Sequence, residues 1–160
     1  MNEWNLPWEG GCRCGRARLR VVKPPLLTGI CHCSGCQKMT ASAFSTTVTL
    51  PGDGLEVLSG ELVRGGLQQD PAHHSFCALC KSWLFTRVDG FDWFVNVRAT
   101  MLDDHGWFVP FVELWASEKL PWASSPAAHS FATSPDLPEW EGLMKDYAAR
   151  GARPMPHSGV

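Results

Sequence analysis

The cysteines are the residues whose type and spacing point most directly to chemistry. The chain has 7 cysteines in 160 residues, and an odd number cannot all pair as disulfides within one chain. They form three closely spaced groups: Cys12 and Cys14, then Cys31, Cys33 and Cys36, and finally Cys77 and Cys80. Cysteines grouped in this way are typical zinc ligands.

A division into four and three cysteines predicts two different zinc sites. Side chains two residues apart on an extended strand share a face, so each C-x-C pair can aim two sulfurs at one point. Cys31, Cys33 and Cys36 can hold one ion by themselves, with a fourth position left for water or substrate, as in catalytic zinc sites. A closed structural site would then take the remaining four: Cys12, Cys14, Cys77 and Cys80. The sequence therefore predicts two zinc ions per chain.

An alternative for the three-cysteine group is a second closed site with a fourth ligand from elsewhere in the chain. The candidates for that ligand are His73, His74 and His105. His32 is a poorer candidate, because strand alternation turns it away from the cysteines on either side. Iron–sulfur clusters are disfavoured, since the C-x-C spacings match no ferredoxin pattern.

The elements that must position these cysteines are mostly short strands. Alternating or β-branched segments bounded by Gly and Pro predict strands at 16–22, 26–31, 44–50, 55–58, 61–64, 73–76, 83–88, 91–97 and 108–114. Residues 34–42 can form one or two helical turns with Ser34 as N-cap. We therefore expect a mainly β fold, a single zinc-pinned domain of short antiparallel sheets.

The C-terminal part of the chain is different in character. Residues 123–136 are rich in Ser, Pro and Ala and predict a surface connector. From Pro138 to Arg150, apolar residues recur at helical spacing, with Gly151 following the end, and this predicts one C-terminal helix. We expect a zinc-binding β domain at 1–137, the helix at 138–150 packed on it, and a disordered tail at 151–160.

The overall composition excludes several classes of protein. The chain has 14 basic and 16 acidic residues, a net charge of −2, which argues against binding mainly to nucleic acid or anionic membranes. No apolar run approaches the roughly 18 residues needed to cross a bilayer. The first residues lack the pattern of a signal peptide, so we expect a cytoplasmic protein.

The cysteine motifs, taken in order, resemble those of a known family. Three segments carry the resemblance: Gly10–Gly15 (GGCRCG), Cys31–Cys36 (CHCSGC) and Phe76–Cys80 (FCALC). Weaker similarities follow in Leu102-Asp103, in Lys119–Trp122 and from Phe131 to Pro138. Together they are similar to the glutathione-dependent formaldehyde-activating enzymes, a family that also includes centromere protein V. The similarity covers roughly residues 10–138.

The resemblance carries expectations about function. It implies a carbon–sulfur lyase that combines glutathione and formaldehyde into S-hydroxymethylglutathione, with the four-cysteine zinc structural and the zinc of Cys31, Cys33 and Cys36 catalytic. Partners would be a small thiol and a small aldehyde. Arg13 and Lys38 are candidates to bind the carboxylates of glutathione. The alternative is a non-catalytic zinc-stabilised module that binds thiols or another protein.

The chain departs from the family pattern at four positions. Lys81 stands where the family usually has Gly, which adopts a positive φ easily, and Ala41 stands at another common Gly position. Gln37 replaces a frequent Arg, and Glu113 replaces a frequent His. None of these changes removes an expected metal ligand, so the fold should be shared more closely than the substrate contacts.

Overall fold

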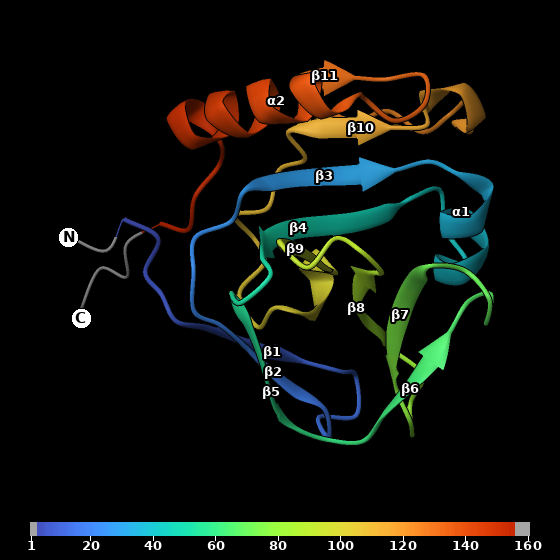
Figure 1. Ribbon diagram of the computed structural model, residues 1–160, viewed down its shortest axis with the longest axis vertical. Helices are drawn as coiled ribbons and strands as arrows, with labels where there is room; N and C mark the ends of the chain where they lie inside the picture. The colour runs from blue at the N-terminus through green and yellow to red at the C-terminus, as the bar shows by residue number, and fades with distance from the viewer. Residues whose placement is uncertain (1–2, 156–160) are drawn as a thin grey trace.

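Strands provide most of the regular structure in the computed structural model, which describes residues 3–155. Within these residues eleven strands form two sheets (Figure 1). The smaller sheet is antiparallel and has the order β1 (Trp8–Gly11), β2 (Arg18–Val21) and β5 (Leu55–Ser59). The mainly β fold class predicted from the sequence is confirmed.

The larger sheet has eight strands and is mixed. Its order is β11 (His129–Ser130), β10 (Val112–Leu114), β3 (Leu27–Cys31), β4 (Ser45–Pro51), β9 (Phe94–Val97), β8 (Trp83–Val88), β7 (Ala72–Cys77) and β6 (Leu62–Gly65). β10 pairs parallel with both β3 and β11, which corrects the expectation of antiparallel sheets. A parallel neighbour needs a long crossover. Between β3 and β10 the chain passes through β4 to β9 and the 3-10 helix η1 (Ala99–Met101), and between β10 and β11 it passes through the 3-10 helix η2 (Ala116–Glu118).

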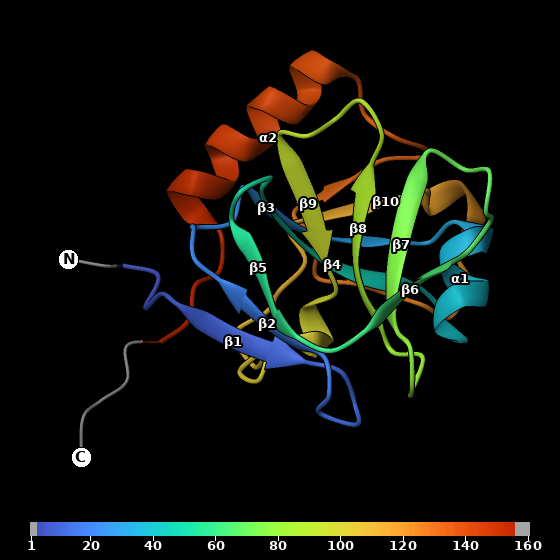
Figure 2. The ribbon, with the colours of Figure 1, turned by 60° about the horizontal axis from the view of Figure 1, so that its bottom comes forward.

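The main core lies between the two sheets. Leu19 and Val21 of β2 are fully buried, whereas the alternate Arg18 and Arg20 are partly exposed, as expected of a strand with one face on the core. They pack with residues of β4, β8 and β9 such as Val48. Figure 2 shows the small sheet lying beside β4 and β9. This core holds the turns after β1 and β7 in place, and those turns carry four of the cysteines.

Strand boundaries differ from the predictions where backbone chemistry interrupts a run. β9 begins at Phe94 rather than 91 because two turns precede it: one through Gly90, with a φ of +79° and a Phe91 N–H that donates to the Val88 carbonyl, and a second at residues 92 and 93. β10 begins at Val112 rather than 108, after Pro110, which has no N–H to donate. β1 was missed because its two glycines weaken the strand pattern. A Cβ on Gly10 would lie 2.3 Å from the Met101 carbonyl oxygen, so this close approach requires glycine.

The C-terminal helix α2 (Leu137–Arg150) covers one side of the larger sheet. Asp136 caps it and forms a reciprocal capping box with Glu139, which satisfies two otherwise unpaired N–H groups. Its buried face, Leu143 and Tyr147, packs on Leu27 of β3 in a second apolar cluster. Figure 1 shows the helix lying along β3 and β10. The predicted helix is confirmed with one more residue at its start.

Two expectations about the C-terminal part are changed. The segment 123–136 is more than a surface connector, because it contains β11 and the buried Ala123. We expected disorder from residue 151, but the described residues 151–155 contact the body: the Arg153 guanidinium lies over the Trp4 ring, and Pro154 is buried. Residues 156–160 of that expected tail lie outside the described residues.

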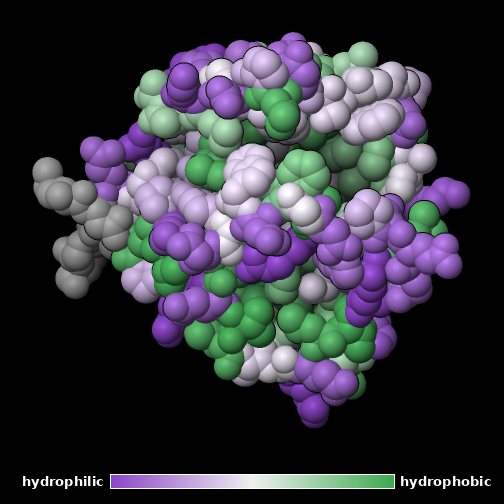
Figure 3. Space-filling model, viewed as in Figure 1, coloured by the Kyte–Doolittle hydropathy of each residue, from purple (hydrophilic) through white to green (hydrophobic). Residues whose placement is uncertain are grey.

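The visible surface is mixed in polarity. Figure 3 shows polar side chains over much of one face, with apolar atoms gathered in the lower part of the view, where the small sheet and β6 lie. The exposed apolar residues include Val57 and Leu58 on the edge strand β5. Among residues 3–155, none of the helices has the length and apolar character needed to span a membrane.

Candidate metal centres

The first cysteine cluster joins two turns that are far apart in the sequence. Cys12 and Cys14 follow β1, and Cys77 and Cys80 lie at the end of β7 and in the turn to β8. The four sulfurs lie within 4.8 Å of one another, with 3.4 Å between Cys12 and Cys14 and 3.8 Å between Cys14 and Cys77. These are not disulfide distances, which are about 2.05 Å. A tetrahedron with metal–sulfur bonds of about 2.3 Å has sulfurs about 3.8 Å apart, so the cluster could hold zinc.

Backbone hydrogen bonds shape both turns of this four-cysteine cluster. The Ala17 N–H donates to Cys12 Sγ at 3.3 Å, and the Lys81 N–H donates to the Cys77 carbonyl at 3.0 Å. Lys81 has a φ of +60°, the left-handed conformation that favours glycine. Lys81 thus has the positive φ that the family's usual glycine adopts easily. The Arg13 N–H donates to Ser82 Oγ at 3.1 Å, which links one turn to the other.

The thiols of this cluster have strongly divided proton affinities. Hydrogen bonds from the hydroxyl and backbone of Ser82 lower the pKa of Cys80 to about 5. A backbone hydrogen bond from Arg16 acts to lower the pKa of Cys14, but its bond with Cys12 and burial raise it to about 11. Crowded sulfurs that share protons in this way suit a cation in place of those protons.

The second cluster, Cys31, Cys33 and Cys36, is formed by one short segment where β3 passes into the helix α1 (Ser34–Thr40). The three sulfurs lie within 4.8 Å of one another, and all three residues are partly exposed. The N-cap is Cys33, not Ser34, because Cys33 Sγ accepts the N–H of Cys36 at 3.3 Å. The start of the helix therefore turns two of the sulfurs toward the third.

No histidine in residues 3–155 completes this three-cysteine cluster. His73 bonds to the Asp89 carboxylate and His74 to the Thr86 hydroxyl. His105 lies at 2.7 Å from the Leu102 carbonyl oxygen. Among the described residues the group therefore consists of three sulfurs without a fourth Cys, His, Asp or Glu donor, and the open zinc site stays a prediction.

Hydrogen bonding divides the proton affinities of these three thiols as well. The bond from Cys31 lowers the pKa of Cys36 to about 6, aided by the hydroxyl of Ser45 and the positive charge of Arg98. The same bond and burial raise the pKa of Cys31. Cys36 is thus the sulfur most easily present as thiolate at neutral pH.

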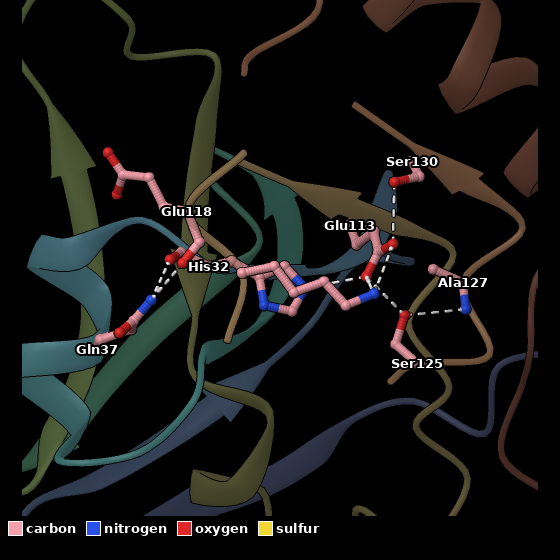
Figure 4. A network of polar contacts seen from close by, with 8 residues as sticks. His32, Gln37, Glu113, Glu118, Ser125, Ala127 and Ser130 are labelled. Carbon is pink, nitrogen blue, oxygen red and sulfur yellow. Dashed lines mark hydrogen bonds and ion pairs between the residues drawn. The ribbon is translucent and has the colours of Figure 1, made fainter. Parts of the chain in front are cut away.

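A buried polar network supports the backbone of this cluster from behind (Figure 4). His32 is fully buried, and its Nε2 lies 2.9 Å from Glu113 Oε2. Glu113 also accepts hydrogen bonds of 2.9 Å from the hydroxyls of Ser125 and Ser130, and Lys119 Nζ lies 3.4 Å away. Burial acts to raise the pKa of Glu113, but these hydrogen bonds outweigh it and lower that pKa to about 2. The network thus holds the Glu113 carboxylate against His32, the residue between Cys31 and Cys33.

A second contact fastens α1 to the same distant segment. Gln37 Nε2 donates to the carbonyl of His32 at 2.7 Å and to the carbonyl of Glu118 at 3.0 Å. The Ser34 N–H donates to the Glu118 carboxylate at 2.5 Å. Figure 4 shows Gln37 and Glu113 approaching the His32 segment from opposite sides. In this chain Gln37 therefore fastens the start of α1 to the backbone of His32 and Glu118.

The two candidate substrate-binding cations lie at different clusters. Arg13 is exposed between two members of the four-cysteine cluster. Lys38 is exposed on α1, where it lines an open groove of about 540 Å³ together with Leu120 and Trp122. Only Lys38 shares its element with a cysteine of the three-cysteine cluster.

Sequence reasoning missed Arg98, a buried cation whose charge acts on the three-cysteine cluster. It follows β9 directly, and an arginine after an apolar strand reads as an exposed residue at a strand end. No sequence signal marks it as buried. Sequence reasoning also missed the contact between His32 and Glu113, because the two residues are 81 positions apart in the chain.

Comparisons with known proteins agree on the identity of the cysteine-bearing region. A family model described as "Glutathione-dependent formaldehyde-activating enzyme" matches residues 7–118, a range that includes all seven cysteines. A Halomonas elongata protein named "Putative glutathione-dependent formaldehyde-activating enzyme" is 33% identical over 87 residues, 48% of this chain. That match spans 55% of the relative, so little more than half of its length is represented.

A solved structure supports the fold. The crystal structure of a Rhodobacter sphaeroides protein superposes with a TM-score of 0.50 at 22% identity, and the match covers 59% of this chain and 87% of that one. The family match ends before β11 and α2 begin. The Ser125 and Ser130 contacts to Glu113 therefore come from outside the matched region.

Proposed function

This chain belongs to the glutathione-dependent formaldehyde-activating enzyme family, and on that premise we propose that it is a zinc-dependent carbon–sulfur lyase. Its proposed partners are a small thiol such as glutathione and a small aldehyde such as formaldehyde. The observation that carries the proposal is the difference between the clusters: four sulfurs gathered in one place and three in the other.

We assign the four-cysteine cluster as a structural zinc site and the three-cysteine cluster as the reactive one. When bound by three thiolates, zinc supplies a fourth position where a thiol can bind as thiolate or an aldehyde oxygen can be polarised. The partial exposure of Cys31, Cys33 and Cys36 supports this assignment, because a substrate must reach that position from solvent.

In the proposed reaction a bond forms between the thiol sulfur and the carbonyl carbon. The proton of the thiol ends on the former aldehyde oxygen, which becomes the hydroxyl of the S-hydroxymethyl product, and the reverse reaction breaks the same bond. Lys38 is our candidate to attract a carboxylate of glutathione, since it lines a groove on α1, the helix that also carries Cys36. Arg13 is the second candidate, but it lies at the other cluster.

Free thiols are required at both clusters, and all seven cysteines are unpaired. Thiols persist in reducing compartments, so the proposal includes a cytoplasmic location.

Calorimetry of the zinc-loaded protein with glutathione and S-methylglutathione tests the open position. Glutathione must lose its thiol proton on binding, and its free pKa is about 8.5, so its affinity should rise about tenfold per unit from pH 6 to 8. S-methylglutathione cannot form a thiolate and should bind much more weakly without proton release. Equal affinity for the two would refute the open-position assignment.

Turnover is tested separately from binding. Zinc-loaded protein mixed with glutathione and formaldehyde should accelerate formation of S-hydroxymethylglutathione, followed by exchange NMR at equilibrium, and Cys33→Ser should abolish the acceleration. Thiolate binding without acceleration would favour the non-catalytic thiol-binding module instead.

A further inference from the structure

Arg98 is buried without the partner that a buried cation normally has. Arg98 as a whole is 6% exposed, and no carboxylate of the described residues lies within 4 Å of its guanidinium, the distance limit for an ion pair. Its Nη2 donates to the Asn96 carbonyl at 3.3 Å, its guanidinium lies 4.2 Å from the centre of the Trp83 ring, and its Nε has no hydrogen-bond partner. A buried charge is costly unless an opposite charge compensates it.

Strand register puts Arg98 on the same face of the larger sheet as Cys31. β3 and β4 pair Cys31 with Ser45, and β4 and β9 pair Val48 with Val97. Successive side chains alternate between the two faces of a sheet. Ser45 lies three residues before Val48, and Arg98 lies one residue after Val97, so both point to the face opposite those two valines. That is the face on which Cys31 lies.

The charges that act on Arg98 are those of the three-cysteine cluster. Burial lowers the pKa of Arg98 to about 10, and the opposing contributions come from the negative charges of Cys36 and Cys31. The interaction is mutual, since Arg98 favours the thiolate of Cys36. The four-cysteine cluster has no equivalent: its thiolates are favoured by backbone N–H groups and Ser82.

We propose that Arg98 is a positioning residue that supplies the counter-charge of the three-cysteine centre and sets its preference for an anionic fourth ligand. The inference rests on the proposed use of that cluster as an open zinc site. A zinc ion with three thiolates carries a net charge of −1, and a fourth thiolate makes it −2. A fixed guanidinium on the same face of the sheet as Cys31 reduces these to 0 and −1, which favours thiolate over a neutral ligand at the same position.

The experiment compares Arg98→Met, which removes the charge, with Arg98→Lys, which keeps it. Arg87→Met is the matched control, because Arg87 is an exposed arginine on the neighbouring strand β8. Zinc affinity at the weaker site is measured by chelator competition on zinc-loaded protein. Glutathione and neutral imidazole are then compared as ligands by calorimetry.

Arg98→Met should weaken zinc binding at the weaker site and glutathione binding by about 10- to 100-fold each, the range for outer residues that support metal ligands. Imidazole affinity should change little, and Arg98→Lys should restore most of the glutathione affinity. Arg87→Met should change either affinity less than about fivefold, as for other exposed charges. Retention of the tighter zinc ion and an unchanged circular dichroism spectrum establish that the variants fold.

Equal weakening of glutathione and imidazole in Arg98→Met would overturn the proposal, since it would show a packing role alone. Unchanged affinities would overturn it too. Both results leave the proposed function intact. The proposed function itself fails if the unsubstituted protein binds only one zinc ion, or binds glutathione no better than S-methylglutathione. Failure of the Arg98 proposal is seen only in the Arg98 variants, so the two failures can be told apart.

Discussion

The two cysteine clusters are built from the same side chain but differ in how the chain brings them together. The four-cysteine cluster joins the turn after β1 to the turn after β7, and 63 residues separate Cys14 from Cys77. The three-cysteine cluster comes from one segment at the junction of β3 and α1. A ligand that ties distant segments stabilises the fold by closing a long loop, whereas a local cluster leaves the fold largely independent of its occupancy.

Their surroundings differ in the same sense. The four-cysteine cluster is supported by the hydrogen bonds of its own two turns and by Ser82. The three-cysteine cluster relies on residues brought from elsewhere, namely Glu113 bound to His32, and Arg98, whose positive charge acts on Cys36 from the end of β9, two strands away from β3. The four-cysteine cluster is therefore largely self-contained, whereas the three-cysteine cluster depends on charges and contacts from the rest of the fold.

The largest expected effect separates the clusters by stability. Cys77→Ser should lower the melting temperature by more than about 10 °C, because structural zinc binding contributes directly to folding free energy and each kcal/mol shifts the transition by about 2–4 °C. Cys33→Ser should remain largely folded, with a melting temperature within a few degrees of the unsubstituted protein. Calorimetric melting curves measure both, and equal losses would mean that the clusters do not differ in role.

The number of zinc ions per chain reports on the occupancy of each cluster. Protein purified without chelators should contain close to two zinc ions per chain, and Cys33→Ser close to one, because four and three sulfurs serve separate ions. Elemental analysis gives both values. A single zinc ion in the unsubstituted protein, or iron with visible colour, would contradict the division.

Glu113→Gln tests the buried network with little change of shape. The amide removes the negative charge that accepts hydrogen bonds from His32, Ser125 and Ser130. Zinc affinity at the three-cysteine cluster should fall about 10-fold or more, and unfolding by urea should show a loss of about 1–3 kcal/mol. The four-cysteine zinc should be retained.

Glu118→Gln is the matched control for this network, because Glu118 is exposed and its amide oxygen can still accept the Ser34 N–H. This substitution should change the zinc affinity of the three-cysteine cluster and the free energy of unfolding only slightly. A similar effect from both substitutions would mean that the buried charge of Glu113 has no special part.

The smallest effects concern two strained residues, one beside each cluster. Lys81 and Ala41 have φ values of +60° and +49°, a conformation that costs roughly 1–2 kcal/mol for a residue with a Cβ. Lys81→Gly and Ala41→Gly should each stabilise the protein by up to about 1 kcal/mol, after the extra backbone entropy of glycine is subtracted.

Gly90→Ala is the opposite control for strain, since Gly90 has a φ of +79° and open space around its Cβ position. It should destabilise the protein by about 1 kcal/mol. Urea unfolding curves compare the three variants. A loss of stability in both Lys81→Gly and Ala41→Gly would show that backbone strain at residues 81 and 41 does not limit the stability of the protein.

Much of the fold was predictable because its signals are local. β3, β8 and α2 lie where β-branched runs, alternation and helical spacing followed by Gly151 predicted them, within one residue at each end. The errors fall where one residue overrides a pattern, as Gly90 and Pro110 do at β9 and β10. The parallel pairing of β10 with β3 was not predictable, since direction depends on the path of the chain between them.

The amino-acid sequence was enough to predict the three local groups of cysteines, because residues two or three apart are held together by local backbone geometry. It was also enough to predict the mainly β class and the C-terminal helix. The fold joins Cys12 and Cys14 to Cys77 and Cys80, and it places the charged residues around the three-cysteine cluster. Glu113 meets His32, and Arg98 reaches the face of Cys31, through pairing between strands distant in sequence. Such contacts depend on register and burial, which no spacing of residues along the chain records.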